Sequence, residues 1–352
     1  MVRVYPTTVA TIVVILITLY LVFYHLPKET HQVKKDDKDP DEAKHLWADS
    51  HGDPVYVLLT SDGNTLGGMI AAMNSVYKNA KGPVRFLLVV DKDNEDHLRT
   101  WMTQTDLKRI NYTIAVFDED WVKGKIAVKG GRPELASPLN VARFYTPKLF
   151  PSIDSRVVYL DSDVIVQGDI IELNNTKLKD SHIAAFSEDC SSLSKRFNLF
   201  QNNYASYINF QNDKVKALGM NPGTCSFNSG VFVANMKAWK EEKITEKLEF
   251  WMSLNTETDV YGNQRGGGVA QPPMLIAFYG KHSTIDPYWH VRHLGWSTGS
   301  RYSEEFLNHA KLLHWSGSFK PWKGKAQYNY MWERYYVPDP TGKFKLVRKY
   351  VH

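Results

Sequence analysis

The chain has 352 residues, of which 43% are hydrophobic, 13% aromatic and 23% charged, with 22 Gly and 16 Pro. This mixture excludes collagen, a coiled coil, low-complexity disorder and a disulfide-dense mini-domain. Lys and Arg number 43 against 38 Asp and Glu, an excess too small for a nucleic-acid-binding protein. The two cysteines, Cys190 and Cys225, form no CxxC pair, so a structural zinc site built on thiolates is also excluded.

The N-terminal region predicts a membrane anchor. Residues 4–24 carry no formal charge, and a helix of this length rises about 31 Å, enough to cross a bilayer core of about 30 Å. A cleaved signal peptide is the alternative, but the apolar run is too long for one and no small-x-small cleavage site follows it. We therefore expect a cytoplasmic tail at 1–6, a transmembrane signal anchor at 7–26 and a charged stem at 27–51.

The orientation of this anchor rests on two opposing observations. A plain Lys/Arg count places the lysine-containing stem in the cytoplasm, although interleaved acidic residues bring its local net charge close to zero. Two N-x-Thr acceptors, at Asn111 and Asn174, favour a glycosylated lumenal domain. We expect a single-pass type II membrane protein of the Golgi or endoplasmic reticulum. That lumen would permit a Cys190–Cys225 bridge, and two free thiols are equally compatible with the sequence.

Beyond the stem, strand and helix patterns alternate. Apolar runs that end in polar residues predict buried parallel strands, and apolar positions at helical spacing predict helices between them. Such alternation is typical of an α/β domain with a mostly parallel, Rossmann-like sheet and helices on both faces. Ligands bind at the carboxyl ends of strands in these sheets. The expected strands are 54–61, 84–91, 112–117, 156–161, 183–188 and 229–234; the expected helices are 62–80, 95–107, 137–150 and 236–254.

Asp161 and Asp163 follow the strand at 156–161 directly. At a strand end, two carboxylates separated by one residue can converge on a divalent cation that also holds a diphosphate. Two surface acids in a turn are the simpler alternative. In a second alternative the first aspartate is a phosphatase nucleophile, but that arrangement normally begins the fold and needs a later acid pair. The preceding buried strand favours the metal site.

A second motif, at 314–322, begins with His314, which follows a short apolar strand at 311–313. A neutral imidazole is a suitable third ligand beside two carboxylates for Mn²⁺. Gly317 allows backbone amides to approach a phosphate, and Lys320 supplies positive charge to a departing diphosphate. The spacing His-x-x-Gly-x-x-Lys-Pro-Trp makes this block more specific than a single histidine.

Five motifs, at 58–62, 139–145, 159–164, 227–232 and 314–322, occur in the order typical of one family. The chain resembles the family 8 glycosyltransferases, most closely the glycosyltransferase 8 domain-containing branch of animals, over residues 54–345. The resemblance implies a type A nucleotide-diphospho-sugar transferase fold in a lumenal domain at 52–346, followed by a tail at 347–352. It also implies a UDP-sugar donor, Mn²⁺ or another divalent cation, retention of anomeric configuration, and a glycan, glycoprotein or glycolipid acceptor.

The same resemblance assigns roles to individual residues. Metal ligands would be Asp161, Asp163 and His314; catalytic residues would be Asp161, Asp163, Lys320 and Asn228; donor-binding residues would be Thr60, Asp62, Arg143, Asp161, Gly230, Gln271, Gly317 and Lys320. Simpler roles remain open for four of these positions. Arg143 could be a surface charge, Asn228 a turn former, and the pair at 60 and 62 a helix cap.

One departure from the family pattern bears on activity. Many members carry an Asp-Gln pair before the last helix, whereas this chain has Ala270-Gln271 followed by Pro272 and Pro273, similar to the plant galacturonosyltransferase branch. The donor sugar therefore stays open among glucose, galactose, xylose and galacturonate. We expect a metal-dependent transferase that uses a front-face route, because no carboxylate stands out as a covalent nucleophile. The alternative is a noncatalytic nucleotide-sugar or glycan-binding protein on the same scaffold.

Aromatic residues near the C-terminal motif have two interpretations. They could form a platform for an acceptor sugar, since aromatic faces stack on sugars, or they could pack in a core. The residues concerned are Trp289, His290, His293, Trp296, Trp315 and Trp322.

Overall fold

The computed structural model describes residues 53–127, 133–190, 202–261, 267–296 and 302–348. The expected cytoplasmic tail, membrane anchor and stem at 1–51 lie outside these residues. All described residues belong to one compact unit.

Within the described residues, no helix combines the length and the apolar character needed to cross a membrane.

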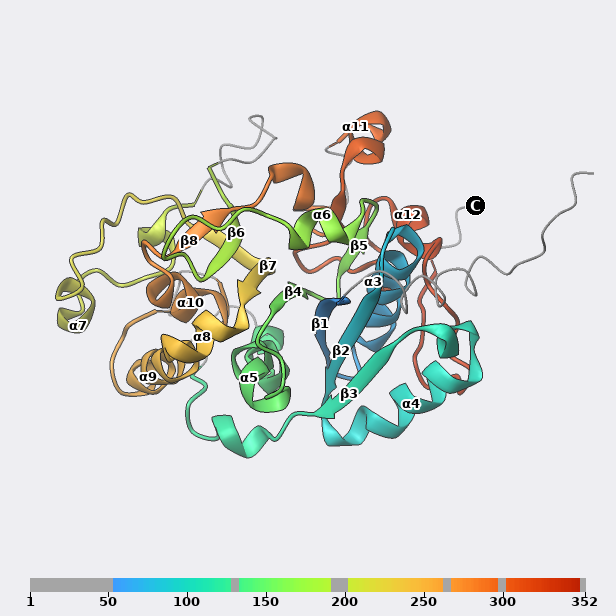
Figure 1. Ribbon diagram of the computed structural model, residues 1–352, viewed down its shortest axis with the longest axis horizontal. Coiled ribbons are helices and arrows are strands. Elements are labelled where there is room, and N and C mark those ends of the chain that lie inside the picture. Colours follow the sequence, from blue (N-terminus) through green and yellow to red (C-terminus); the bar gives the residue numbers. More distant parts are fainter. Residues whose placement is uncertain (1–52, 128–132, 191–201, 262–266, 297–301, 349–352) are drawn as a thin grey trace, which may run out of the picture. The chain divides into compact units, whose positions relative to one another are not determined.

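Seven strands of the described chain form one sheet, in the order β3-β2-β1-β4-β7-β6-β8 (Figure 1). Of these only β7 runs against its neighbours, so the expectation of a mostly parallel sheet is confirmed. Two further strands, β5 and β9, form a small antiparallel ladder. The strands are β1 Val55–Ser61, β2 Val84–Val90, β3 Tyr112–Val116, β4 Arg156–Leu160, β5 Val164–Val166, β6 Ala184–Glu188, β7 Phe227–Asn235, β8 His282–Thr284 and β9 Leu312–His314.

Helices cover both faces of the large sheet, as expected from the alternating pattern. They are α3 Leu66–Asn79, α4 Glu95–Gln104, α5 Thr146–Leu149, α6 Ile170–Asn174, α7 Asp213–Lys216, α8 Met236–Glu241, α9 Ile244–Glu257, α10 Gln271–Ala277, α11 Glu304–His309 and α12 Asn329–Glu333.

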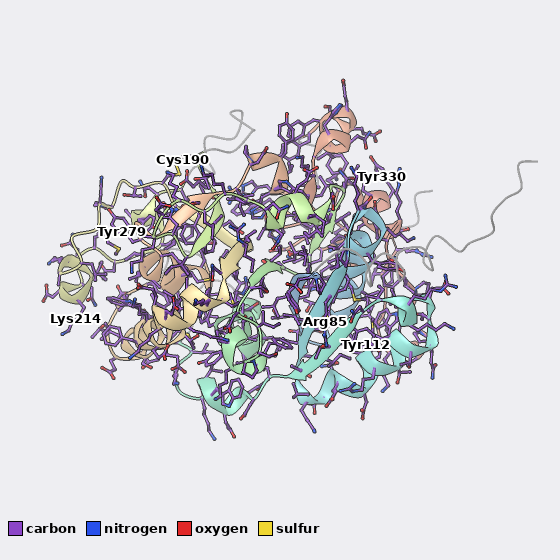
Figure 2. The ribbon with its side chains drawn as sticks, viewed as in Figure 1. Arg85, Tyr112, Cys190, Lys214, Tyr279 and Tyr330 are labelled. Carbon is purple, nitrogen blue, oxygen red and sulfur yellow. A yellow bond between two sulfur atoms is a disulfide. The ribbon has the colours of Figure 1, made fainter. Side chains whose placement is uncertain are left out.

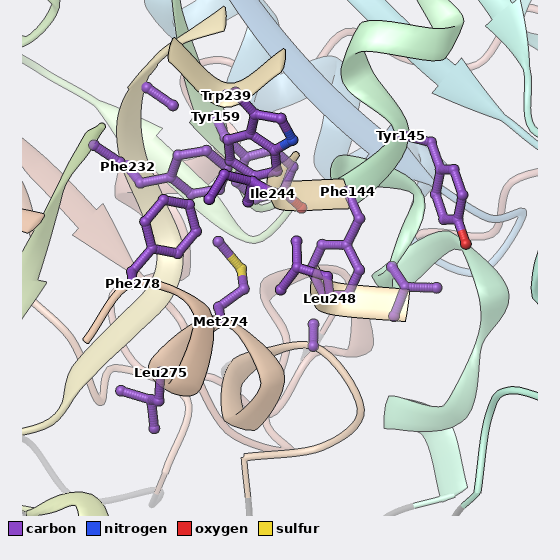
Figure 3. Close-up of a cluster of buried hydrophobic side chains, with 14 of the residues drawn as sticks. Phe144, Tyr145, Tyr159, Phe232, Trp239, Ile244, Leu248, Met274, Leu275 and Phe278 are labelled. Carbon is purple, nitrogen blue, oxygen red and sulfur yellow. The ribbon is translucent and has the colours of Figure 1, made fainter. Parts of the chain in front are cut away.

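The central strands are buried on both faces because successive side chains point to opposite sides of a strand. In β1, Val57 and Leu59 pack in a core with α3, α4 and α6, whereas Leu58 packs in a second core with α8, α9 and α10. Figure 3 shows part of this second core, where Trp239 of α8, Met274 of α10 and neighbouring aromatic rings are buried together. Near-continuous apolar runs are therefore required in these strands, which is why they were recognisable in the sequence.

Two of the expected helices are wrong in their extent. The segment at 137–150 is not one long helix but two 3₁₀ turns followed by the single turn of α5. Pro147 explains the break, because proline lacks an N–H and fits only in the first turn of a helix, where α5 places it. The helix at 236–254 is interrupted at Lys243, which has a left-handed backbone with φ of 51° and separates α8 from α9.

Candidate metal and nucleotide-sugar site

The small β5–β9 ladder joins the two halves of the candidate site. In its register Val164 pairs with His314, and the Trp315 N–H donates to the carbonyl oxygen of Asp163 at 2.9 Å. Strand pairing thus places the acidic motif after β4 beside a histidine about 150 residues later in the sequence. This long-range pairing, and not the local sequence, positions the imidazole.

Asp161, Asp163 and His314 converge in the way expected for a metal site. The His314 Nε2 atom lies 2.9 Å from Asp163 Oδ1 and 3.9 Å from Asp161 Oδ2. One ligand atom from each residue falls within 4.8 Å of the others. Two carboxylates and an imidazole suit Mn²⁺ among other divalent cations, so the donor set fits the expected cofactor.

Each carboxylate of this cluster also has a cationic partner. The Arg143 guanidinium contacts Asp161 Oδ1 at 2.9 Å, and the Lys320 ammonium pairs with Asp163. Burial would raise the pKa of Asp163, but His314 and Lys320 outweigh it and hold that pKa well below its ordinary value. Asp163 is therefore a buried, ionised carboxylate at neutral pH, as a metal ligand must be.

Gly230 on β7 leaves the space that this cluster occupies. Its carbonyl oxygen accepts a hydrogen bond from the Asp161 N–H at 2.8 Å. A Cβ atom added to Gly230 would lie 2.5 Å from Asp161 Oδ2, 2.7 Å from His314 Cε1 and 2.9 Å from Asn228 Oδ1. No other amino acid therefore fits here without displacing the ligands.

Asp161, Asp163 and His314 form the candidate metal-binding cluster, or metal cluster. A pocket with a volume of about 340 Å³ opens onto it. Nine of the expected site residues line it: Arg143, Asp161, Asp163, Asn228, Gly230, Gln271, His314, Gly317 and Lys320. Gly317 has φ of 118°, a backbone conformation that strongly favours glycine. The structure therefore brings most of the predicted residues together around one cavity.

Thr60 and Asp62 occupy the carboxyl end of β1, as expected, but neither is among the residues that line this pocket. The Thr60 hydroxyl is hydrogen-bonded to the Tyr159 hydroxyl at 3.2 Å. Asp62 Oδ1 accepts from the Thr65 N–H at 3.0 Å, just before α3 begins. The N-cap of α3 is Thr65, with no side-chain cap hydrogen bond, so Asp62 stabilises the preceding turn and does not cap the helix. Contact of Thr60 or Asp62 with a donor stays a prediction.

The family model described as glycosyl transferase family 8 matches residues 56–326. The chain belongs to glycosyltransferase family 8. Glycosyltransferase 8 domain-containing protein 1 of Bos taurus is 47% identical over 307 residues, covering 86% of this chain and 82% of that protein. Glycosyltransferase 8 domain-containing protein 2 of Homo sapiens is 44% identical over 338 residues, covering 94% of this chain and 95% of that protein. The resemblance to the animal branch is thereby confirmed.

Among solved structures, this family 8 chain is similar to the galactosyltransferase LgtC, whose structure was solved in complex with donor and acceptor sugar analogues. The TM-score is 0.61 at 18% sequence identity, and the match covers 82% of this chain and 100% of LgtC. The similarity confirms the expected glycosyltransferase fold with its mostly parallel α/β sheet.

Asn228 stabilises a local turn and also lines the pocket, while its catalytic role stays a prediction. Its Oδ1 atom accepts from the Gly230 N–H at 2.8 Å, which is a local turn-stabilising contact. Its Nδ2 atom donates to Gln271 Oε1 at 3.4 Å, on the wall of the pocket. The Gln271 amide also lies beside the Tyr207 hydroxyl, which lines the same pocket.

Two aromatic side chains support the cluster, and the sequence indicated neither of them for this role. The Tyr159 hydroxyl donates to Asp161 Oδ1 at 2.8 Å, and the Arg143 Cζ atom lies 3.9 Å from the centre of the Tyr159 ring. The two-residue period of β4 could have indicated Tyr159. His290 Nε2 lies 2.7 Å from His314 Nδ1, and the two rings are stacked. His290 was expected only as part of an acceptor platform, whereas tertiary packing places it against His314.

The aromatic residues near the C-terminal motif mostly belong to the core. Trp289, Trp315 and Trp322 are buried, whereas Trp296 is 50% exposed and lines the pocket. Only Trp296 among these four tryptophans therefore retains the expected access to an acceptor.

Proposed function

We propose that this family 8 protein is a metal-dependent, retaining glycosyltransferase. It moves a sugar from a UDP-sugar to a hydroxyl group of a glycan, glycoprotein or glycolipid. The observation that carries the proposal is the convergence of Asp161, Asp163, His314 and Lys320 at the mouth of a 340 Å³ pocket. The donor and acceptor analogues bound to LgtC support the same class of substrates.

The acidic residues and the histidine of the cluster have a different proposed role from the neighbouring basic residues. Asp161, Asp163 and His314 would hold a divalent cation, preferentially Mn²⁺, which when bound supplies Lewis-acid stabilisation of the diphosphate. Once the carboxylates ligate a cation, Lys320 and Arg143 are available to neutralise negative charge on the departing UDP. Gly317 leaves room for the phosphates beside the backbone.

The acidic residues of the pocket argue for a front-face route. Within the described residues, the only Asp and Glu side chains that line the cavity are Asp161 and Asp163, and both serve the cation. No carboxylate is left there to act as a covalent nucleophile, as a double displacement requires. An oxygen of the departing UDP would therefore assist removal of the acceptor proton on the same face of the sugar.

We extend the proposal to the cellular location. The structure contains a Cys190–Cys225 disulfide, one of the two states compatible with the sequence, and disulfides persist in oxidising compartments. Asn111 is exposed at the start of β3 and Asn174 is partly exposed at the end of α6, so the first acceptor is accessible for glycosylation. Both features suit a type II protein whose domain lies in the lumen of the Golgi or endoplasmic reticulum.

The experiment that tests the proposal is sugar-dependent release of UDP. The domain from residue 52 onward would be incubated with Mn²⁺ and a panel of UDP-sugars, with and without glycan acceptors. We expect release that is lost on metal chelation and in Asp163→Asn, and retained in the control Asp154→Asn, which changes an exposed carboxylate paired with Lys240. Metal-dependent UDP binding without release from any donor would instead identify a noncatalytic binding protein, the alternative raised by Ala270.

A further inference from the structure

The pocket has a second polar wall, formed by residues outside the metal cluster, that the proposed chemistry does not use. Asn202, Tyr207, Gln271 and Arg292 line it. Burial raises the pKa of Tyr207 to about 12, so its hydroxyl keeps its proton at neutral pH. Because Asn228 links Gln271 to the strand that carries Gly230, the wall continues directly from the metal cluster.

Arg292 is the charged member of this wall, and its charge is fully paired. Its guanidinium forms an ion pair with Asp189, and both side chains are at least 95% buried. The second carboxylate oxygen of Asp189 accepts a hydrogen bond from the Ser226 hydroxyl. Asp189 does not line the pocket, so it holds Arg292 from behind.

The position of Asp189 is fixed by covalent and backbone contacts. Its N–H donates to the Ser226 carbonyl oxygen at 2.8 Å. The next residue, Cys190, labelled in Figure 2, forms the disulfide with Cys225, which precedes Ser226. The Asp189–Arg292 pair is thus attached to the end of β6 and the start of β7, two strands of the central sheet.

Binding of a metal would leave the Arg292–Asp189 ion pair intact, unlike the two other ion pairs of the pocket. Arg143 and Lys320 are paired with Asp161 and Asp163, so ligation of a cation by those carboxylates leaves both bases to face a diphosphate. Asp189 is not a candidate ligand, and Arg292 therefore keeps its partner. The second wall remains electrically neutral while it still presents N–H donors.

Hydrogen-bond donors without net charge bind an uncharged sugar better than a sugar that carries a carboxylate. The guanidinium of Arg292 can donate five hydrogen bonds, and its Nη1 atom donates one of them to Asp189 Oδ1. Gln271 adds an amide group that lies beside the Tyr207 hydroxyl. Hydroxyl oxygens of an uncharged sugar satisfy such donors, whereas a buried carboxylate needs an unpaired cation to offset its loss of hydration.

We propose that Arg292, positioned by Asp189, binds hydroxyl groups of the donor sugar beside Gln271, which was already expected to bind the donor, and restricts the donor to an uncharged hexose or pentose, against a hexuronate. The inference rests on the proposed use of a UDP-sugar and deepens it. It selects among the donors that the sequence leaves open, and it opposes the galacturonate suggested by Pro272 and Pro273.

The test compares binding of UDP with matched donors that differ only in oxidation at C6. Affinities of UDP, UDP-glucose and UDP-glucuronate, and of UDP-galactose and UDP-galacturonate, would be measured by calorimetry in the presence of Mn²⁺. For the wild-type domain we expect at least one uncharged donor to bind about tenfold or more tightly than its uronate. Equal or tighter binding of the uronates would overturn the proposal.

Asp189→Asn provides the diagnostic variant, because it removes the negative charge behind Arg292 and leaves the guanidinium unpaired. We expect the preference over the uronate to shrink by about tenfold or to reverse, with unchanged affinity for UDP. An equal loss of affinity for UDP and for the UDP-hexose would show a merely structural role and would also overturn the proposal. If this variant fails to fold, Arg292→Lys takes its place. It keeps the charge but loses the planar fork, and should weaken binding of the UDP-hexose without changing that of UDP.

Asp339→Asn is the matched control. Asp339 forms a buried pair with His97, with side-chain exposures of 2% and 6%, and neither residue lines the pocket. We expect it to lower stability without changing sugar preference. This test measures binding, so its outcome is independent of catalysis. Absence of UDP release from every donor would refute the proposed transferase activity, whereas the donor preference would still be decided by the binding affinities.

Discussion

Gly230→Ala is the most informative single substitution for the geometry of the metal cluster. The added Cβ atom would lie 2.5 Å from Asp161 Oδ2. To reach an ordinary contact of 3.4 Å, the carboxylate oxygen must move by about 0.9 Å. Gly230 does not have a positive φ, so the substitution adds no backbone strain and its effect comes from this collision.

The expected consequence is a loss of metal binding that exceeds the loss of stability. The collision involves Asp161, His314 and Asn228, two of them expected metal ligands. Displacing the groups that hold metal ligands in position typically lowers metal affinity by about 10- to 100-fold. Overpacking by one methyl group costs about 1–3 kcal/mol of folding free energy.

Calorimetric titration of Mn²⁺ in the presence of UDP, together with thermal unfolding, measures both effects. Gly223→Ala is the control, because its nearest contact would be a side-chain atom of Asn221 at 3.3 Å in an exposed turn. It should leave both measurements unchanged. Wild-type affinity for Mn²⁺ and UDP in Gly230→Ala would refute the reasoning that the cluster binds the metal in this arrangement.

Three further substitutions test other parts of the account. Lys320→Ala should lower the kcat of UDP release by about 100-fold or more, because one electrostatic contact to the departing group is lost; an unchanged kcat would contradict the role given to this base. His290→Phe should weaken Mn²⁺ binding by about 10- to 100-fold through loss of the 2.7 Å contact to His314, and titration would show no change if that contact were incidental. Asp339→Asn should reduce the free energy of unfolding by about 1.5–3 kcal/mol at pH 7. Burial would raise the pKa of Asp339, but N–H donors of Phe344 and Thr341 outweigh burial and lower it. The stabilisation is therefore present above the unfolded pKa of about 3.9 and is lost as the pH falls through the lower folded value. Denaturant unfolding at pH 7 and pH 3 should show the difference from wild type shrinking at the lower pH, and an equal difference at both would contradict this origin.

The strands were predictable because burial on both faces requires a continuous apolar run. Residues 156–161 were expected as a strand, and β4 occupies Arg156–Leu160 with Asp161 directly after it. The position of the acidic motif at a strand end therefore followed from the sequence. Helix extent was less predictable, because the apolar spacing at 137–150 and 236–254 continues through Pro147 and Lys243, where the backbone changes direction.

The contacts between distant segments could not be predicted from residue patterns alone. Asp189 and Arg292 are separated by 103 residues, and neither stands in a motif of its own. His314 was proposed as a ligand from its own motif, and the family resemblance implied the same role, whereas its contact with His290 depends on how the loop before β9 packs. Thr60 shows the opposite case, in which a motif residue is buried against Tyr159 and does not line the pocket.

Diffraction from crystals of the domain grown with Mn²⁺ and UDP would test the central claim most directly. Anomalous scattering locates manganese independently of the protein chain. We predict one manganese peak bounded by Asp161, Asp163 and His314 Nε2, with the UDP diphosphate between that peak and Lys320. A peak at another place, or UDP bound with the imidazole still paired to Asp163 and no metal between them, would contradict the account.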